Sequence, residues 1–339
     1  MSQAQHTSLR GRVAAGAQPR QRGMTLVELM VGLVIGIVLS LAAASLYLAT
    51  RETSRTSQSI SDVNETGKIA LEMIGREIQK AGFFPAQFGF DAATANQFAG
   101  AFENTKEAGN VVFNTGLFGC DGGNYNPATK ACPPIPAAST PDSIVINYFS
   151  TPEFGAGSLM GNANDCNRRP VSGDPANNAA AAASQPLFVS NRFSIVDTAS
   201  YVDNDKNTVT VNSLGCHGNG DELQAAAQPA IEGVEDMVIR YGIYGAGTDQ
   251  SPTQFITAAQ VNAAGTINTR TPWQRVTAVS VCIVVRSLAN SRQEDKAGEA
   301  RTYLNCRDAA PQPLPAGSRF IYKSFQRVYA VRNNLSGVL

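Results

Sequence analysis

Six cysteines are the residues of this 339-residue chain with the clearest capacity for chemistry. Cysteines form disulfides or bind zinc, and zinc sites usually contain closely spaced cysteines or several histidines. The sequence has no CxxC motif, and its two histidines are His6 and His217. These spacings favour disulfides over a metal site. The disulfide candidates are Cys120, Cys132, Cys166, Cys216, Cys282 and Cys306.

The pairing of these cysteines remains open, because six cysteines allow many connectivities. Proximity in the sequence favours the pairs Cys120–Cys132, Cys166–Cys216 and Cys282–Cys306. The first pair would close a loop rich in glycine, asparagine and proline. The third would join a strand to the extended segment that follows it. Such cross-links suit a chain that works outside the cell.

A weaker metal candidate is the acidic turn formed by Asp203, Asp205 and Asn207, whose spacing matches the start of a calcium loop. Thr208 stands where that loop requires glycine, and Leu214 stands where it requires glutamate. Asn and Asp also favour turns, so a turn between two strands is the expected structure. No metal or other cofactor is therefore expected, and calcium remains an alternative for this turn.

Enzyme signatures are absent from the sequence, which lacks a P-loop, GxSxG, HExxH, and a GxGxxG motif after a strand. Charged residues make up 16% of the chain, with 27 basic and 27 acidic residues. Nucleic-acid-binding domains cluster Lys and Arg on one face, and no such cluster occurs in this sequence. The prediction is a protein that is not an enzyme and does not bind nucleic acid.

The element that organises the chain is an apolar run from Leu29 to Ala49. Its length of about 21 residues is close to the roughly 20 that cross a membrane as a helix. Glu28 lies at the edge of this run, where an unpaired carboxylate is costly and indicates a function. The segment before it contains four arginines and no acid, which predicts a cytoplasmic N-terminus. The rest of the chain is then expected outside the inner membrane.

The sequence from Gly23 to Glu28, GMTLVE, resembles the cleavage and methylation signal of type IV prepilins and type II secretion pseudopilins. The resemblance implies that a prepilin peptidase cuts after Gly23 and that Met24 becomes the methylated N-terminus. It also implies that Glu28 lies against the N-terminal ammonium of a neighbouring subunit in the filament. Met24 departs from the usual phenylalanine, and the leader, residues 1–23, is long. A plain signal anchor, or a secretory signal cut near Ala42–Ala44, is the alternative.

Helical periodicity continues beyond the apolar run and predicts one helix over residues 24–81, with residues 24–49 in the membrane or filament core. Gly67 and Gly75 weaken this prediction. Gly82 is a typical helix C-cap residue, and Pro85 prevents the helix from resuming. Residues 82–339 are then expected to form a β-rich globular domain outside the membrane.

Alternating apolar residues predict several strands in the globular domain. The predicted strands are residues 143–150, 207–214, 236–244, 275–287 and 325–332. The expected fold class is α+β and type IV pilin-like. A long N-terminal helix packs on one antiparallel sheet or on two small abutting sheets, with long disulfide-stapled loops.

Four further segments resemble the PilW group of minor pilins and the J-type pseudopilins: residues 76–84, 231–243, 284–287 and 331–333. The resemblance to the PilW group implies a minor pilin that takes part in initiating type IV pilus assembly, in a priming or tip complex. The implied partners are other minor pilins, the major pilin, prepilin peptidase and the inner-membrane assembly platform. The implied location is the inner membrane, in a single pass, and then the pilus.

Two other functions remain open on the sequence. The first is a J-type pseudopilin of a type II secretion system, which shares the fold and the processing signal. The second is a pilus-tip adhesin, in which exposed aromatic side chains bind a surface. The aromatic candidates are Tyr125, Phe149 and Phe154.

Overall fold

The computed structural model describes 15 segments of the chain. They are residues 23–83, 116–126, 132–134, 140–150, 163–171, 187–197, 200–202, 206, 208–220, 227–247, 249–267, 270–290, 302–308, 310–314 and 318–334. The chain divides into two compact units, Met1–Thr53 and Ser54–Leu339. The leader before Gly23, the calcium candidates Asp203, Asp205 and Asn207, and Phe154 lie outside the described residues.

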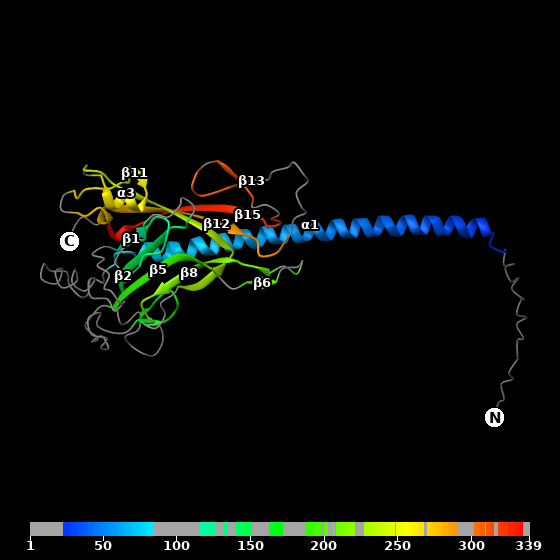
Figure 1. The fold of residues 1–339 in the computed structure, drawn as a ribbon, viewed down its shortest axis with the longest axis horizontal. Helices are drawn as coiled ribbons and strands as arrows, with labels where there is room; N and C mark the ends of the chain where they lie inside the picture. The colour runs from blue at the N-terminus through cyan, green and yellow to red at the C-terminus, as the bar shows by residue number, and fades with distance from the viewer. Residues whose placement is uncertain are drawn as a thin grey trace, which may run out of the picture. The chain divides into compact units, whose positions relative to one another are not determined.

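The longest element is helix α1, which runs without interruption through 55 residues, Leu26–Lys80 (Figure 1). It begins two residues later and ends one residue earlier than the sequence predicts. The Thr25 hydroxyl accepts a hydrogen bond of 3.3 Å from the backbone N–H of Glu28, which caps the first turn. At the other end Gly82 adopts a positive φ of 71°, the left-handed conformation that terminates helices.

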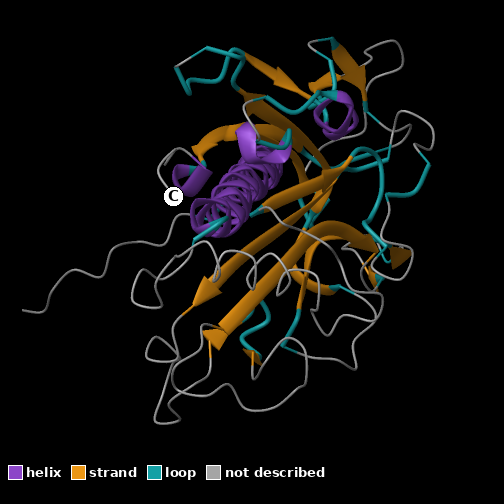
Figure 2. Ribbon diagram, turned by 90° about the vertical axis from the view of Figure 1, so that its left-hand side faces the viewer, coloured by secondary structure: helices purple, strands orange, loops and turns teal. Residues whose placement is uncertain are grey.

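The second unit contains two larger antiparallel sheets, which confirms the predicted α+β fold class (Figure 2). The five-stranded sheet has the order β1-β2-β5-β8-β9. Its strands are β1 (Leu117–Cys120), β2 (Ser143–Ser150), β5 (Leu187–Asp197), β8 (Asn212–Gly218) and β9 (Gln228–Glu232). The four-stranded sheet has the order β11-β10-β12-β15. Its strands are β10 (Val234–Ile243), β11 (Gln254–Ile256), β12 (Val276–Arg286) and β15 (Tyr322–Ala330).

Short elements complete the second unit. Three two-stranded pairs lie outside the larger sheets: β3 (Ala163–Asn164) with β4 (Pro170–Val171), β6 (Tyr201–Val202) with β7 (Thr208–Val209), and β13 (Thr302–Leu304) with β14 (Pro311–Pro313). Helix α3 spans Ala258–Ala263, and 3-10 turns span Trp273–Arg275 and Arg332–Asn334. The single strand predicted over residues 207–214 is therefore wrong. It is divided between β7 and β8, which belong to different sheets.

The core of the second unit forms where the C-terminal half of α1 meets the sheets. Val63, Ala70, Ile74 and Ile78 recur at helical spacing and are almost fully buried. They belong to the same apolar cluster as residues from both sheets, which include Ile144, Phe193, Leu214, Met237, Val279 and Val281. The helix is therefore a structural member of the globular unit from about Val63 onward.

Two glycines on α1 accommodate aromatic rings of β15. A Cβ atom at Gly67 would overlap the Phe325 ring, and one at Gly75 would overlap the Tyr329 ring. The Tyr329 hydroxyl donates a hydrogen bond of 2.5 Å to the backbone carbonyl of Leu71. Gly67 and Gly75 have a low helix propensity, but their lack of a side chain lets β15 lie directly against the helix.

The end of the chain closes the end of α1. The Asn333 side-chain amide donates to the backbone carbonyls of Ala81 at 2.9 Å and Lys80 at 3.4 Å. The carbonyls at a helix C-terminus have no partner within the helix, so these bonds satisfy them. The neighbouring Asn334 donates to the carbonyl of Val276 at 2.9 Å. Residues more than 250 positions apart therefore form one junction.

Three disulfides link loops to strands, and they are the pairs that sequence proximity favours. Their Cα–Cα distances are 5.4 Å for Cys120–Cys132, 6.3 Å for Cys166–Cys216 and 5.5 Å for Cys282–Cys306. All three lie within the usual range for disulfides. Each bond joins a strand residue to a residue outside the two larger sheets.

Candidate assembly site on the N-terminal helix

The predicted processing site lies directly before α1. Gly23, Met24 and Thr25 precede the first helical residue, and Met24 is 68% exposed. A Cβ atom at Gly23 would meet no other atom within 4 Å. The Gly23–Met24 peptide bond is therefore in an open, non-helical segment. Such a segment can enter the active site of a peptidase without unfolding the helix.

Glu28 is the one charged side chain between Met24 and Thr50. Its backbone N–H is held by Thr25, but its carboxylate has no hydrogen-bond or ion-pair partner within the described part of the chain. An unpaired carboxylate in an apolar environment costs several kcal/mol, so it requires a cation from elsewhere. The geometry leaves Glu28 available to another molecule.

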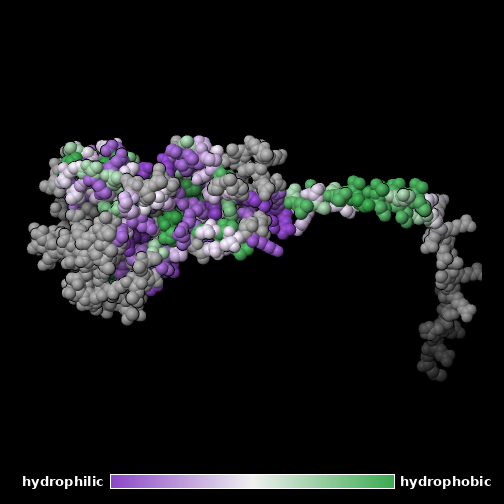
Figure 3. Space-filling model, viewed as in Figure 1, coloured by the Kyte–Doolittle hydropathy of each residue, from purple (hydrophilic) through white to green (hydrophobic). Residues whose placement is uncertain are grey.

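The rest of the first unit's helix has an apolar, uncovered surface (Figure 3). Leu26, Ile37 and Leu46 are 75%, 52% and 69% exposed, respectively. By length and composition, α1 is the one helix in the described residues that could cross a membrane. The hydroxyl groups of Ser40, Ser45 and Thr50 each donate a hydrogen bond of 2.8 Å to a backbone carbonyl of the same helix. Such internal bonds remove the cost of placing these side chains in lipid.

Gly32 and Gly36 lie one helical turn apart on the same side of this helix. Apart from the helix's own backbone, no atom of the described residues lies within 4 Å of a Cβ built at either position. Small residues at this spacing allow the backbones of two helices to approach closely. The two glycines therefore leave an open gap on the helix surface, the Gly32–Gly36 notch, which begins about one turn after Glu28.

In the second unit, a polar contact within the buried interface fixes α1 to the five-stranded sheet. Glu77 accepts hydrogen bonds from Asn191 Nδ2 at 2.8 Å and from Lys80 Nζ at 2.6 Å. The other end of the Asn191 amide accepts from the backbone N–H of Cys166 at 3.0 Å. Burial, and next the negative charge of Glu77, raise the pKa of the Tyr148 hydroxyl. The hydroxyl therefore stays protonated beside Glu77.

Buried carboxylates join the two sheets. Asp142 lies just before β2 and accepts hydrogen bonds from the backbone N–H groups of Gly122 at 2.9 Å and Ile239 at 2.8 Å. Burial raises the pKa of Asp142, although these two hydrogen bonds oppose the shift. On β10, Glu235 forms an ion pair of 3.0 Å with Arg286, and burial raises its pKa as well.

The third of these carboxylates anchors a disulfide-linked loop. Asp236 pairs with Arg307 at 2.8 Å, and Arg307 also donates to the backbone carbonyl of Thr140 at 2.7 Å. Arg307 directly follows Cys306, so the ion pair and the disulfide hold the same segment. Burial raises the pKa of Asp236. The acids of this unit thus act as structural connectors between sheets and loops.

The predicted assembly residues and the predicted disulfides belong to different units of the chain. Gly23, Met24 and Glu28 lie within one and a half turns at the start of α1, in the first unit, whereas all six cysteines lie in the second. Among the described residues, no group of three or more His, Cys, Asp or Glu side chains is arranged to hold a metal ion. Of the predicted aromatic candidates, Tyr125 and Phe149 are 7% and 1% exposed, so neither offers an exposed ring.

Sequence reasoning missed the supporting residues around this site. Thr25 and Glu28 form a T-x-x-E pattern, which is the signature of a capping box, so the Thr25 cap could have been found. Glu77, Asn191, Asp142 and Asn333 carry no comparable local signal. Their long-range partners lie 97 to 252 residues away in the chain.

Comparisons with known protein families agree with this arrangement. Residues 18–44 match the prokaryotic N-terminal methylation motif, which together with the apolar helix supports a membrane-anchored pilin that is assembled into a pilus. Residues 200–333 match the type IV pilus-assembly protein W family. Together the two matches, which cover less than half of the chain, support a PilW-type minor pilin of type IV pili. Proteins of this family are structural components of pili and interact with other pilus components.

Among solved structures, the chain resembles a type IV-like pilin from Thermus thermophilus with 11% sequence identity and a TM-score of 0.28. The alignment covers 71% of this chain and 95% of the Thermus chain. No curated protein matches the sequence. The family assignment rests on the two matched segments.

Proposed function

We propose that this chain takes part in initiating type IV pilus assembly and works in a priming or tip complex with other minor pilins. One observation carries the proposal. A methylation motif leads directly into the apolar part of α1, in which Glu28 is the only charged side chain before Thr50 and has no partner within the described chain. Such a helix is complementary to other helices of the same kind, each with a free N-terminus and an apolar surface.

The proposed sequence of events starts with hydrolysis of the Gly23–Met24 peptide bond by prepilin peptidase at the cytoplasmic face. Cleavage removes the basic leader and creates an ammonium group on Met24, which is then methylated. In the apolar core of a filament, the Met24 ammonium of one subunit would pair with Glu28 of another. Opposite charges attract strongly at low dielectric, and a displaced pair leaves both charges buried and unpaired. The pair would therefore set the register of each subunit.

Before assembly, the first half of α1 would wait in the inner membrane and present itself to the assembly platform. During assembly, the Gly32–Gly36 notch would let a neighbouring helix approach closely. The globular unit is held to the second half of α1 by its own core, so it would travel with the helix. Its size and long loops suit a tip position, where one side is free of neighbours.

Electron microscopy of a deletion strain, combined with an assay of secreted proteins in the same cultures, tests this function. The proposal predicts few or no surface pili with normal secretion, and pili restored by the wild-type chain. Normal pili with lost secretion would instead assign the chain to the pseudopilus of a type II system. Normal pili with normal secretion would contradict the initiating role and leave a tip adhesin as the remaining hypothesis.

Mass spectrometry of the N-terminus tests the processing step separately. The wild-type chain should begin with methylated Met24. Replacing Gly23 by Leu should leave the full leader in place, because a large side chain replaces the small residue at the cleavage point. A Gly23→Leu chain that still begins at Met24 would show that cleavage does not depend on this position.

A further inference from the structure

Strand β15 is the terminal strand of the four-stranded sheet (Figure 1). It contains nine residues, Tyr322–Ala330, and pairs with β12 over its full length without a register shift. Among the described residues no strand is hydrogen-bonded to its other side, although β13 contacts β15 at its start, where the Tyr303 and Tyr322 rings lie 5.3 Å apart. β15 is therefore a long, regular edge strand.

The backbone groups of β15 alternate between β12 and the open side. Val331 donates from its N–H to the carbonyl of Thr277 at 2.8 Å, and the carbonyl of Ile321 accepts from Ser287 at 2.8 Å. Alternate residues of an antiparallel strand point to the same side, so the odd-numbered residues between these two bond to β12. The N–H and C=O groups of Ser324, Gln326, Val328 and Ala330 point away from β12. Within the described chain they have no backbone partner.

The other edges of the two larger sheets are protected in ways that β15 is not. β11 has three residues, and β1 has four and ends at the disulfide-bonded Cys120. β9 contains Pro229 and has a register shift against β8. Short strands, prolines and irregular pairing prevent an edge from pairing with other chains. β15 has none of these features, so its open edge needs another explanation.

Charged side chains do not block this edge, although β15 carries two of them. Lys323 Nζ donates to Asn64 Oδ1 on α1 at 2.7 Å and lies over the Phe325 ring. The Arg327 guanidinium lies 5.7 Å from the centre of the Tyr329 ring. Both side chains are thus held on the face of the sheet that packs against α1. The opposite face carries the side chains of the residues whose backbone points to the open edge.

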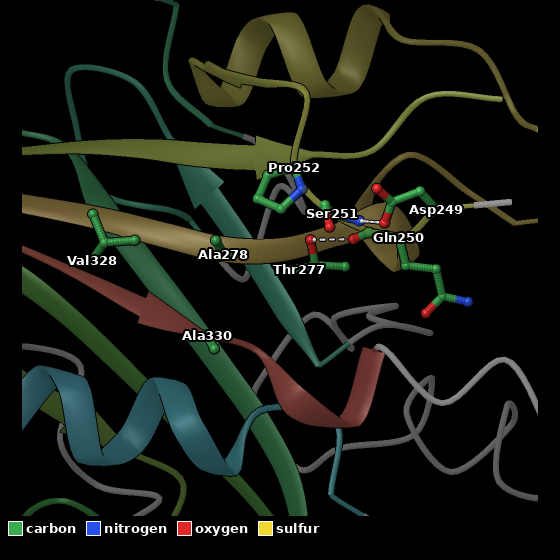
Figure 4. A pocket seen from close by; sticks show the side chains of 8 residues that line it. All are labelled: Asp249, Gln250, Ser251, Pro252, Thr277, Ala278, Val328 and Ala330. Carbon is green, nitrogen blue, oxygen red and sulfur yellow. Dashed lines mark hydrogen bonds between the residues drawn. The ribbon is translucent and has the colours of Figure 1, made fainter. Parts of the chain in front are cut away.

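A pocket of about 570 Å³ lies on that opposite face, next to the open edge (Figure 4). Val328 and Ala330 of β15, with Thr277 and Ala278 of β12, form one side of it. The loop from Asp249 to Pro252 forms the other. Val328 is 55% exposed. The lining is small and mostly apolar, so the pocket can receive an apolar side chain from a strand placed beside β15.

We propose that β15 pairs through its open edge with an extended strand of a different pilin subunit, one of whose apolar side chains occupies the pocket beside Val328 and Ala330. Only an extended backbone matches donors and acceptors that repeat every second residue. Backbone pairing supplies affinity and a side-chain pocket supplies selectivity in known strand-addition complexes. On the α1 face, acidic side chains of the incoming strand would lie beside Lys323 and Arg327. The identity of the occupant as a pilin rests on the proposed function.

The test compares two substitutions at Gln326 in the full chain, expressed in the deletion strain. Gln326→Pro removes one N–H from the open edge and places a ring there, while the pairing of odd-numbered residues with β12 is preserved. Gln326→Ala is the matched control, because it loses the same side-chain contact with Ser280 but keeps the N–H. The proline variant should reduce surface pili by about tenfold or more. The alanine variant should remain within about twofold of the wild type.

Two further variants keep the test independent of folding. Val328→Lys keeps every backbone group and places a charge at the pocket, and it should also reduce pili. A photo-cross-linking residue at Val328 should form a product with a different pilin, and peptide mapping should place the cross-link in a strand of that pilin. The same residue at Val202, which is 67% exposed on β6, should not form this product. Adding Gln326→Pro should abolish it.

The outcomes separate this inference from the proposed function. Normal pili in both the proline and the lysine variants, in a strain that makes no pili without the chain, would overturn the inference and leave the function standing. A cross-link to a second copy of this chain, or to a helix of the partner, would also overturn it. A deletion strain with normal pili would contradict the proposed function itself.

Discussion

The two halves of α1 contain glycine pairs in opposite situations. In the second half, the rings of Phe325 and Tyr329 of the same chain occupy the space beside Gly67 and Gly75. In the first half, Gly32 and Gly36 have nothing within 4 Å of a Cβ position. The charged residues differ in the same way, because Glu77 is bonded to Asn191 and Lys80 whereas the Glu28 carboxylate has no partner in the described chain.

This difference shows how one continuous helix can serve two sets of partners. In the second half, the glycines contact aromatic rings and the acid is hydrogen-bonded, all within the same globular unit. These interactions therefore need no other chain. The first half leaves the same kinds of residue available. A helix with such an apolar surface must be shielded from water, either by the lipid of a membrane or by similar helices in a bundle. Pilins occupy both of these environments.

Valine substitutions at Gly75 and Gly36 should give the largest contrast. Gly75→Val would place a branched side chain against the Tyr329 ring, and overpacking of this kind typically costs about 1–3 kcal/mol. Gly36→Val should leave the stability of the globular unit unchanged, because no described residue outside the helix lies within 4 Å of a Cβ at this position. Trp273, the single tryptophan, is 7% exposed in the second unit, so its fluorescence during denaturation in detergent reports on that unit alone.

The same two substitutions should rank in the opposite order when incorporation into pili is measured. Gly36→Val should reduce incorporation into pili, because it fills the notch that a neighbouring helix would use. Equal stability losses from both substitutions would mean that the first half also packs on the globular unit. Such a result would remove the distinction between the two halves.

The dependence of stability on pH should be a property of the second unit. Burial raises the pKa values of Asp142, Glu235 and Asp236, so the folded state binds their protons more strongly than the unfolded state. The contribution of these three acids to the free energy of unfolding is fully present below the ordinary carboxyl pKa of about 4. It is lost as pH rises through their raised pKa values in the folded state. The Trp273 unfolding midpoint should therefore increase as pH falls from neutral through the raised pKa values of these groups.

Asparagine substitution at Asp142 should flatten this increase, even if the variant is less stable at every pH. Asp249→Asn is the control, because Asp249 is exposed and hydrogen bonds from Ser251 lower its pKa. A wild-type midpoint that falls steadily on acidification would contradict the assignment of these buried acids.

The smallest predicted effect concerns the junction at the end of α1. Asn333→Ala removes the side-chain donor to the carbonyls of Lys80 and Ala81, which should cost about 1 kcal/mol. The exposed neighbour Arg332 is the control, since its replacement by alanine should change stability by less than about 0.5 kcal/mol. Equal effects at both positions would show that Asn333 does not stabilise the helix end.

The sequence predicted the helix and four strands of the two larger sheets, because their apolar residues recur with a clear period. It did not predict the short edge strands β1, β9 and β11. β2 was predicted to the residue, and β10, β12 and β15 to within a few residues. The central strand β5 was missed because Asn191 occupies an inward position that an apolar residue would normally fill. Its partner, Glu77, lies more than 100 residues earlier in the chain. Local pattern does not reveal such a pair.

The assembly residues Gly23, Met24 and Glu28 could be proposed from sequence because they form a short, contiguous motif. The roles of Gly67 and Gly75 could not, because propensity counts a glycine only as a helix-weakening residue. Their function becomes visible only with the Phe325 and Tyr329 rings in place. The acids between the sheets are likewise explained by contacts over long sequence distances.

The most direct test of the account is to measure Glu28→Gln in two assays at once. Glutamine keeps the shape of the side chain and removes its charge. Incorporation is measured by immunoblot of sheared pili, and stability by the Trp273 unfolding midpoint of the full chain. The account predicts an unchanged midpoint and incorporation reduced by about tenfold or more, since a buried ammonium would lose its counter-charge. Normal incorporation would contradict the central claim that the first half of α1 is completed by other subunits through Glu28.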